Sequence, residues 1–541
     1  MGSRTTLAAT IALLVVLFPT VCAPPVRAAS GSDVLPIPNT LLGPWDVLAG
    51  VWTSILSPEG SSSIDGGLTR LVNEDAVDAI AAVGIPDHPF MASWGGNNMH
   101  CDAYISDTYE AAGPIGLNMQ VRSRTQGFGG YGTLAFDRLG RIVAVYSNGR
   151  GFQLELLDPI TLQELASYDL PSRPWYWLLQ GIMPWEYIGA GMYFYLDNED
   201  RAIVPTTQNT IQVIGIAAGG ESFELAREYD LSQYVVPMSW PHNDSVAWVL
   251  PDWSGAYYWY ATTGGIVGTV DVDTGRVHTL RLEGEVIENS FAAAEDGVYV
   301  LSDHAMYRFR QDGQGEISVA WRTPYDRGPG QKPGHITRGS GTSVSLMGDE
   351  ATGLVAITDN AEPQIHLLLL ARDTGEIVCS VPLFEEGKSG TDISVACFEH
   401  ADEAGRGTGT YSVLIENNWG HHRFPYSVPQ PGLARVDIVR QPDGTYGCEI
   451  VWESDERSIG VFKLSLGSGL AYMYWRDDAS AIPTWRLIAV DFATGETVYR
   501  RTVGTGLGYN NWAGALFLHP DGGIAYSTTI FGLVMIYDDP S

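Results

Sequence analysis

The feature of this sequence that most restricts its fold is a unit of about 40 residues that recurs from near Tyr131 to the C-terminal end. Each unit alternates four short apolar runs with turns rich in glycine, asparagine and aspartate. Several third runs end on similar turns, at Val270–Gly275, Ala371–Gly375 and Val490–Gly495. There the glycine can adopt a positive φ and an aspartate ahead of Thr-Gly can bond the turn backbone. Because four strands cannot bury both faces alone, such units stack around an axis, and the repeat predicts a β-propeller.

Counting the units predicts the number of blades. They begin near Gly132, Gly189, Asp244, Asn289, Gly341, Ile393, Val461 and Trp512. The last unit stops after its third strand, and the segment Leu117–Thr125 is the natural source of the fourth. Pairing the two ends in one blade removes two exposed strand edges. We therefore expect an all-β, eight-bladed β-propeller over residues 117–541, closed by an N-terminal strand, with a seven-bladed ring as the alternative.

The N-terminal residues 1–28 have the pattern of a secretory signal peptide. Arg4 precedes the apolar run Ala8–Phe18, and the small residue Ala28 at position −1, with Val26 at position −3, favours cleavage after Ala28. That run is short for a membrane span, although an uncleaved anchor is the alternative. The pattern predicts a secreted or periplasmic protein without membrane insertion after cleavage. Residues 29–116 are rich in proline, glycine and serine, and we expect them to form a strap or cap across the ring, with one helix over Glu74–Val83.

The charge and the cysteines limit partners and environment. Asp and Glu number 63 against 31 Lys and Arg, and the formal net charge is −32. Such a surface repels phosphates, which argues against nucleic acid and anionic membranes as partners. Cys101, Cys379, Cys397 and Cys448 follow the signal peptide. With no CxxC pair and an exported chain, they favour one or two structural disulfides.

Polar residues gather in the loops that lead into the first strands, and these loops open on one end of the central channel. We predict His242, Asp244 and Glu288 as catalytic residues, with His242 as the acid–base group. Side chains predicted to bind a small-molecule ligand are Asn97, His100, Arg338, Asn418 and Trp512.

A metal site is also expected at this end of the ring. Amide and carboxylate oxygens converging from several blades suit a hard cation such as calcium. The predicted metal ligands are Glu288, Asn289, Asn417 and Asn510. Asparagine and aspartate before a strand are also ordinary turn residues, which is the alternative interpretation of each one.

The repeats resemble those of a known group. The Asp-Thr-Gly turns, together with the fourth-strand tryptophans in Ala320–Pro324 and Val451–Asp455, resemble the repeats of quinoprotein-like eight-bladed propellers. More loosely, the units look like those of the gluconolactonase-like superfamily. The resemblance implies a channel in which Glu, Asn and Asp surround a calcium ion. It does not extend to the cofactor pyrroloquinoline quinone, because no two cysteines here are adjacent.

These observations favour an exported, cation-dependent enzyme of the hydrolase or lyase class that acts on a small organic substrate in the central funnel. A redox-cofactor or copper-dependent oxidoreductase is the second hypothesis. A third is a non-enzymatic propeller that binds a ligand or a protein, for which the aromatic stretch Trp175–Trp185 is the candidate patch. No nucleophile elbow, phosphate loop or dinucleotide fingerprint is present in the sequence.

Overall fold

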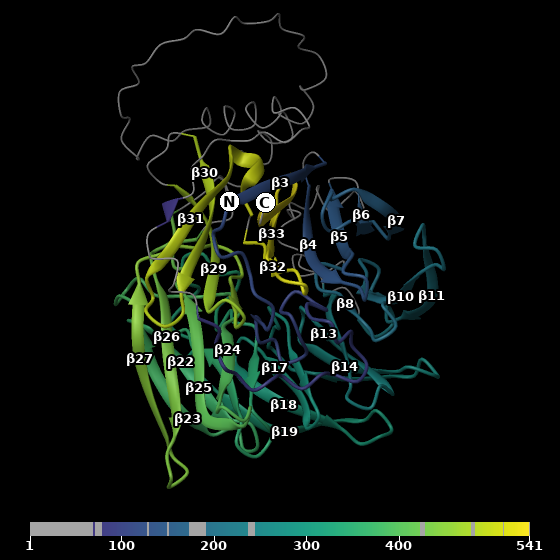
Figure 1. The fold of residues 1–541 in the computed structure, drawn as a ribbon. Helices are drawn as coiled ribbons and strands as arrows, with labels where there is room; N and C mark the ends of the chain where they lie inside the picture. Colours follow the sequence, from purple (N-terminus) through teal and green to yellow (C-terminus); the bar gives the residue numbers. More distant parts are fainter. Residues whose placement is uncertain are drawn as a thin grey trace, which may run out of the picture.

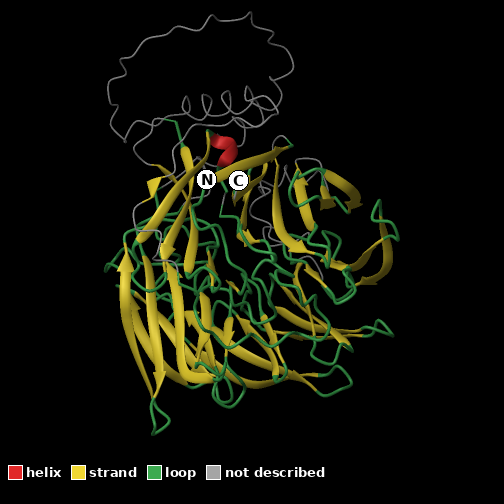
Figure 2. Cartoon of the chain, in the orientation of Figure 1, coloured by secondary structure: helices red, strands yellow, loops and turns green. Residues whose placement is uncertain are grey.

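A computed structural model describes residues 69–70, 78–126, 129–148, 151–172, 191–235, 244–421, 428–477, 482–511 and 513–539. Apart from the short 3-10 helix η4 (Leu507–Tyr509), the regular elements described there are strands (Figure 2). They form eight sheets that follow one another around a ring in sequence order (Figure 1). The prediction of an eight-bladed β-propeller is therefore confirmed, and the seven-bladed alternative is wrong.

Blades 1 to 4 are antiparallel four-stranded sheets. The first strand of a blade lies nearest the axis, where first strands of neighbouring blades contact one another. Blades 1 and 2 comprise β4 (Gly129–Phe136), β5 (Ile142–Asn148), β6 (Phe152–Leu157), β7 (Glu164–Leu170), β8 (Tyr195–Leu196), β9 (Ala202–Pro205), β10 (Thr210–Ile216) and β11 (Phe223–Asp230). Blades 3 and 4 comprise β12 (Val246–Pro251), β13 (Tyr257–Thr262), β14 (Ile266–Asp271), β15 (Val277–Arg281), β16 (Ala292–Ala294), β17 (Gly297–Leu301), β18 (Ala305–Gln311) and β19 (Ile317–Pro324).

Blades 5 to 8 complete the ring, and blade 7 carries two additional strands. Blades 5 and 6 comprise β20 (Ser345–Met347), β21 (Leu354–Thr358), β22 (Ile365–Ala371), β23 (Ile377–Leu383), β24 (Ala396–Ala401), β25 (Gly407–Glu416), β26 (Leu433–Arg440) and β27 (Tyr446–Ser454). Blade 7 comprises β1 (Thr69–Arg70), β2 (Thr108–Tyr109), β28 (Lys463–Ser465), β29 (Leu470–Asp477), β30 (Thr484–Asp491) and β31 (Thr497–Thr505). Blade 8 comprises β3 (Met119–Thr125), β32 (Leu516–Leu518), β33 (Ile524–Thr529) and β34 (Gly532–Asp538).

The ring closes as the sequence predicts. Strand β3 pairs antiparallel with the last strand, β34, from Met119 opposite Asp538 to Thr125 opposite Gly532. It is the fourth strand of blade 8, so residues from both ends of the chain share one sheet. From β3, Arg124 reaches the buried Glu155 of blade 1, with 3.4 Å between Nη2 and Oε2. The closing strand thus also ties blade 8 to blade 1.

Neighbouring blades are joined by the recurring turns. In the turn after β14, the Thr274 amide donates to Asp271 Oδ1 at 2.7 Å, so the bonding aspartate lies three residues ahead of threonine rather than directly ahead of it. The indole of Trp321 in blade 4 donates to the carbonyl oxygen of Arg372 in the turn of blade 5 at 3.0 Å. Trp452 in blade 6 repeats this bond to Phe492 of blade 7 at 2.9 Å. The two fourth-strand tryptophans therefore lock successive blades together.

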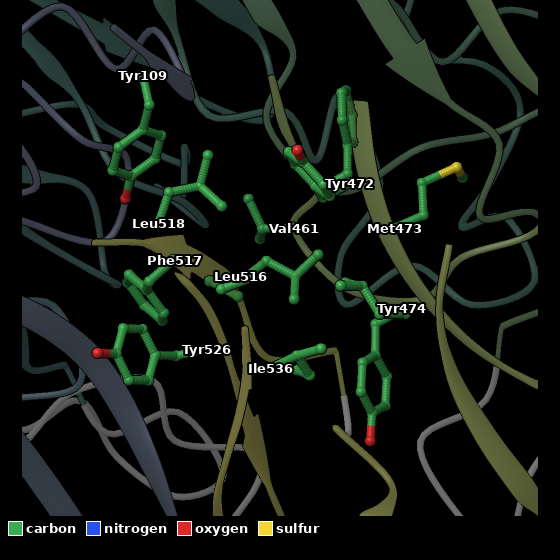
Figure 3. Packing of buried hydrophobic residues seen from close by; sticks show 14 of the residues in the cluster. Tyr109, Val461, Tyr472, Met473, Tyr474, Leu516, Phe517, Leu518, Tyr526 and Ile536 are labelled. Carbon is green, nitrogen blue, oxygen red and sulfur yellow. The ribbon is translucent and has the colours of Figure 1, made fainter. Parts of the chain in front are cut away.

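The apolar core lies between the blades. Figure 3 shows one part of it, where Tyr472 and Tyr474, on one face of blade 7, lie beside Leu516 and Ile536 of blade 8. All four side chains are fully buried or nearly so. Successive residues of a strand point to opposite faces, so each sheet contributes to the two interfaces on its sides.

Residues 78–116 run inside the ring, and we call this segment the strap (Figure 1). Its carbonyl groups accept hydrogen bonds from first strands or the turns after them, in the order of the blades. The amides of Phe136, Leu196, Ala293, Leu346, Cys397, Leu464 and Gly523 donate to the carbonyls of Gly96, Asn97, Ala103, Tyr104, Ser106, Asp107 and Ala112, respectively. The carbonyl groups of the strap therefore accept hydrogen bonds from backbone amides at the inner edges of the blades, which would otherwise be unpaired.

The predicted helix at Glu74–Val83 is wrong over its described part. Residues 78–83 are not helical, and Ala82 forms an isolated bridge with His400 of blade 6. The Val83 amide donates to the Glu399 carbonyl at 2.8 Å. Pairing with a blade edge outweighs the helical tendency of this short segment, because an isolated helix of this length is unstable in water.

One disulfide joins Cys379 of β23 to Cys448 of β27, with 6.4 Å between their Cα atoms. This confirms the expected disulfide and links blades 5 and 6 at their outer edges. Cys101 and Cys397 are buried free thiols.

In the described part of the chain, no helix has the length and apolar character that crossing a membrane would require. Residues 1–28 and the stretch Trp175–Trp185 lie outside the described residues.

Candidate functional site

We call one end of the channel the inlet face. It is the end at which the loops lead into the first strand of each blade. Serine occupies the same place in three consecutive blades: Ser290, Ser343 and Ser394 each stand two residues before a first strand. All three are buried. The repeat thus carries a row of hydroxyl groups around one side of the channel wall.

A buried charged cluster lies where the strap crosses this wall. His100 Nδ1 is 3.0 Å from Asp107 Oδ2, and both residues belong to the strap. Lys463, from the first strand of blade 7, makes an ion pair with Asp107 and donates to the carbonyl oxygen of Met99 at 2.7 Å. The side chains of His100, Asp107 and Lys463 are at most 3% exposed. Burial opposes the charge of Asp107, but Lys463 and His100 hold the pKa of this carboxyl below its usual range.

Ser343 completes a relay with this pair. Its Oγ lies 3.5 Å from His100 Nε2, on the side of the ring that Asp107 does not use. Because an ionised carboxylate can only accept, Nδ1 of a neutral imidazole facing Asp107 carries the proton and Nε2 is left as the acceptor. The order Ser343–His100–Asp107 is therefore the order in which a nucleophile, a base and a group that orients the base stand in a hydrolytic triad.

A small cavity adjoins His100. Its volume is about 20 Å³, which is room for a water molecule or a group of similar size. Its walls come from the strap and from blades 2, 3 and 4. They are formed by Asn98, Met99, His100, Ile105, Tyr193, Phe194, Trp248, Val249, Leu250, Ser290 and Phe291. The ring of Tyr193 stacks on His100 with 6.2 Å between centroids.

Three of the predicted asparagines are brought together at the connection between blades 5 and 6. Asn289 Nδ2 donates to the Asp392 carbonyl at 3.1 Å. Asn417 Oδ1 accepts from the Gly390 amide at 3.2 Å, and Asn418 Oδ1 accepts from Thr391 Oγ at 2.7 Å. The structure thus places residues from blades 4 and 6 around one loop, where their amides hold its backbone.

The other predicted residues are spread over the ring. Glu288 is buried and accepts a hydrogen bond from the Thr337 hydroxyl. Asp244 Oδ1 accepts from the Gly264 amide of its own blade at 2.7 Å. Arg338 is exposed and donates to the Gly328 carbonyl at 2.7 Å.

Asn97 and Asn510 also bind within the fold. Asn97 Nδ2 donates to the Ala92 carbonyl at 2.7 Å, and this bond lies within the strap. Asn510 is buried between blades 7 and 8, where its carbonyl accepts from the Ile530 amide at 2.8 Å. His242 and Trp512 lie outside the described residues.

The residues predicted to bind calcium do not present a ready set of oxygens. Asn417 Oδ1 accepts from two amides, those of Gly390 and Trp419. Glu288 Oε2 accepts from the Thr337 hydroxyl. Among the described residues, no group of three or more His, Cys, Asp or Glu is arranged to hold a metal ion. These contacts do not fit a calcium ion held by the predicted ligands, and no chemical step below depends on one.

The sequence missed Ser343, Asp107 and Lys463. One signal was present: the serine before the first strand recurs in three successive units. Lys463 was also visible as a single cation in an otherwise apolar run. Its partner was not visible, because Asp107 lies 356 residues away in the chain.

Comparison with known proteins adds little to this site. No family model matches the chain. An uncharacterized protein of Archaeoglobus fulgidus is 26% identical over 310 residues, which is 51% of this chain and 58% of that relative. The chain thus aligns with little more than half of the relative's length.

Solved structures with a similar fold include three propellers of different kinds. Sqt1 of Saccharomyces cerevisiae is 12% identical with a TM-score of 0.36, and covers 63% of this chain and 93% of its own. BamB from Moraxella catarrhalis is 14% identical with a TM-score of 0.33, and the match covers 62% of this chain and 96% of BamB. The dihydro-heme d1 dehydrogenase NirN is 12% identical with a TM-score of 0.46, and the match covers 72% of this chain and 68% of NirN. These matches concern the fold and carry no argument about the site. The eight blades themselves confirm the resemblance to quinoprotein-like propellers, which was one of architecture.

Proposed function

We propose that this protein is a hydrolase that cleaves a small ester or lactone at the inlet side of its central channel. The observation that carries the proposal is the alignment of Ser343, His100 and Asp107, with 3.5 Å and 3.0 Å between successive side chains. Propellers serve many functions, so the argument comes from this group and not from the fold.

The reaction uses only groups of the chain, the ester and water. Ser343 Oγ attacks the ester carbonyl carbon while its proton passes to His100 Nε2. The bond between the carbonyl carbon and the alcohol oxygen breaks, and the proton on His100 goes to that oxygen. Water then attacks the acyl-Ser343 ester, and the acid leaves as Ser343 Oγ regains a proton through His100. Asp107 orients the imidazole throughout and stabilises its charged form.

The position of Lys463 supports this assignment of roles. It holds Asp107 on the oxygen that does not face His100 and is itself bound to Met99. A carboxylate fixed in this way keeps the imidazole in one tautomer and one orientation. Calcium stays a prediction from the sequence, and the proposed reaction does not require it.

We further propose that the protein is exported. The Cys379–Cys448 disulfide supports this, because disulfides persist in oxidising compartments. Expression with residues 1–28 fused to a reporter tests the segment as a secretion signal. Retention of the reporter inside the cell would contradict the proposal.

Replacement of Ser343 tests the hydrolase. The full chain and its Ser343→Ala variant are assayed with a chromogenic acetate ester and with a lactone. We expect kcat/KM to fall about a hundredfold or more in Ser343→Ala. Ser394→Ala is the matched control, because Ser394 occupies the same place in blade 6 and should leave the rate unchanged. Intact-mass spectrometry should show an added acetyl group that Ser343→Ala lacks. Equal rates in the three proteins would refute the proposal.

A second function, a non-enzymatic binding propeller, is favoured by one observation. The same cluster anchors the strap, since Lys463 bonds both Asp107 and the Met99 carbonyl. On this model Ser343→Ala changes neither stability nor hydrolysis, whereas loss of Lys463 destabilises the strap. Urea unfolding of Ser343→Ala and Lys463→Met, measured beside the ester assay, separates the two functions.

A further inference from the structure

The connection from blade 4 to blade 5, residues 325–344, is called here the inlet loop. It joins β19 to β20 without regular secondary structure and packs on connections of blades 5 and 6. The Gly420 amide of blade 6 donates to the Pro333 carbonyl at 2.7 Å, and the Asn360 amide of blade 5 donates to the Asp326 carbonyl at 2.8 Å. An irregular connection of this length is uncommon in a packed domain and usually serves a function.

Basic side chains hold the inlet loop, and no apolar core does so. Between residues 326 and 340, all of which the structure describes, no apolar side chain is buried. The large buried side chains there are Lys332 and His335, which are 4% and 6% exposed. Segments that bury little apolar surface open at low cost in free energy. The position of the loop therefore depends on two side chains that can each carry a positive charge.

Lys332 is docked on two backbone carbonyls. Its Nζ donates to the Ala361 carbonyl at 2.7 Å and to the Ser389 carbonyl at 2.9 Å. Burial lowers the pKa of Lys332, and the carboxylates near it oppose this change. One of them makes an ion pair at 3.8 Å, but its side chain is exposed and screened by solvent. These carboxylates belong to Glu362, Asp359 and Asp326.

His335 is the second anchor, and it is buried in its neutral form. Its ring packs against Gly390, where an added Cβ would lie 2.9 Å from His335 Nε2. Neither ring nitrogen makes a hydrogen bond of normal geometry to a described residue. Burial lowers the pKa of His335 and the charge of Lys332 adds to this effect, whereas Asp392 and the Gly339 backbone oppose it. A proton on this ring would place a second buried positive charge beside Lys332, which is costly.

The other titratable groups near the loop do not supply a matching negative charge. Glu416 is fully buried at the end of β25, and burial raises the pKa of its carboxyl well above the usual value, so this group is neutral. Glu288 accepts from the Thr337 hydroxyl of the loop. His421 is buried, and its backbone lies against Gly334. The carboxylate charge that faces His335 is therefore that of Asp392.

We infer that the inlet loop is an acid-sensitive cover of the channel, docked at neutral pH and released when His335 takes up a proton beside Lys332. In the released loop, His335 has the ordinary histidine pKa of about 6.5. Docking therefore has its full strength above about pH 6.5 and weakens as the pH falls toward the lowered pKa of the docked ring. Release uncovers Asn418, whose carbonyl lies against Gly334. The inference does not depend on the hydrolase proposed above.

Hydrogen exchange at two amides tests this cover. The amides of Gly420 and Asn360 are bonded to carbonyls of the loop and exchange only when it opens. Their exchange is measured by mass spectrometry on the full chain at pH 7.5 and pH 5.5 and corrected for the intrinsic rate. The opening constant at both amides should rise severalfold at pH 5.5, up to about tenfold. Amides of β30, which do not contact the loop, should not change.

Removing the titrating group should abolish this response. His335→Leu leaves an apolar side chain of similar size, and its opening constant should be the same at the two pH values. His88→Leu is the matched control, because His88 is also buried but packs on Trp253 of blade 3. It should keep the response of the wild type. If His335→Leu does not fold, His335→Gln takes its place.

Two outcomes would overturn the inference. One is an opening constant at Gly420 that is equal at pH 7.5 and pH 5.5 in the wild type. The other is a pH response that His335→Leu retains, because another group such as Asp392 or His421 would then control the loop. Neither measurement uses ester turnover, so failure of the cover leaves the proposed hydrolase untouched, and failure of the hydrolase leaves the cover untouched.

Discussion

The blades and the strap are built on opposite principles. A blade repeats the same apolar strands and turns, and its stability is shared among many similar contacts. The strap has no repeat, and in the described part of the chain it is held by backbone hydrogen bonds to seven of the blades and by the buried side chains of His100, Asp107 and Lys463. A position in a blade should therefore tolerate change better than a charged position of the strap.

The strongest test of this contrast removes Asp107. Asp107→Ala leaves the Lys463 charge buried without its partner and should lower the free energy of unfolding by about 4 kcal/mol. The same substitution in a blade turn, Asp271→Ala, removes a bond to the Thr274 amide and should cost about 1 kcal/mol. Urea unfolding of both variants measures the difference. The double variant Asp107→Ala with Lys463→Met should recover much of the loss. Equal losses at Asp107 and Asp271 would break the comparison.

Substitution of a glycine in the turns that join blades should give the next largest loss of stability. Gly375 has φ +72°, and an added Cβ would lie 2.5 Å from the Trp321 ring. Gly375→Ala should therefore cost about 3 kcal/mol, from a strained backbone and from displacement of that ring. Gly387 has φ +74° with open space around it, so Gly387→Ala should cost about 1 kcal/mol. Chemical denaturation compares them. If the two variants lose the same stability, the tryptophan contact does not lock the blades.

The strap should also respond to pH in a way that blade turns do not. Burial raises the pKa of Asp102 to about 7, against about 4 in the unfolded chain. Its neutral form thus contributes stability that is complete below about pH 4 and lost as the pH rises through about 7. Asp102→Asn stays neutral and should gain about 2–3 kcal/mol on the wild type between pH 5 and pH 8.

Asp271→Asn is the control for this pH effect. Hydrogen bonds from Thr274 lower the pKa of Asp271, so this group does not titrate between pH 5 and pH 8. Thermal unfolding of each variant is measured at pH 5 and at pH 8. A constant difference between Asp102→Asn and the wild type at the two pH values would contradict the expectation.

The smallest loss of stability is expected on removal of the hydrogen bonds that the tryptophan indoles donate between blades. Trp321→Phe and Trp452→Phe keep an aromatic ring and remove one donor each, so each should lower stability by about 1 kcal/mol. The two sites lie in different blades, and their losses should add in the double variant. Urea midpoints of the three proteins provide the measurement. A double variant that loses much more than the sum would show that the blades are coupled over a longer range.

The site was predictable only in part. The sequence indicated the polar loops, and the structure does bring Asn289, Asn417 and Asn418 to one connection. Their oxygens and amides hold backbone there, because a turn residue with a free amide bonds the nearest chain before it can face a ligand. His100 was identified as a candidate, but its partner Ser343 lies 243 residues away and in another blade. No spacing rule connects these two positions.

The sequence by itself determined the blades, their number and the strand that closes the ring. It could do so because each blade is local: its strands are consecutive, and the period of apolar residues and turns repeats in every unit. Only the tertiary structure decided where the strap runs and which charges it encloses. The strap has no period, and its pairing partners are set by the order of eight blades around the axis. The contacts of Asp107 with Lys463 and of His100 with Ser343 exist only once the ring has closed around the strap.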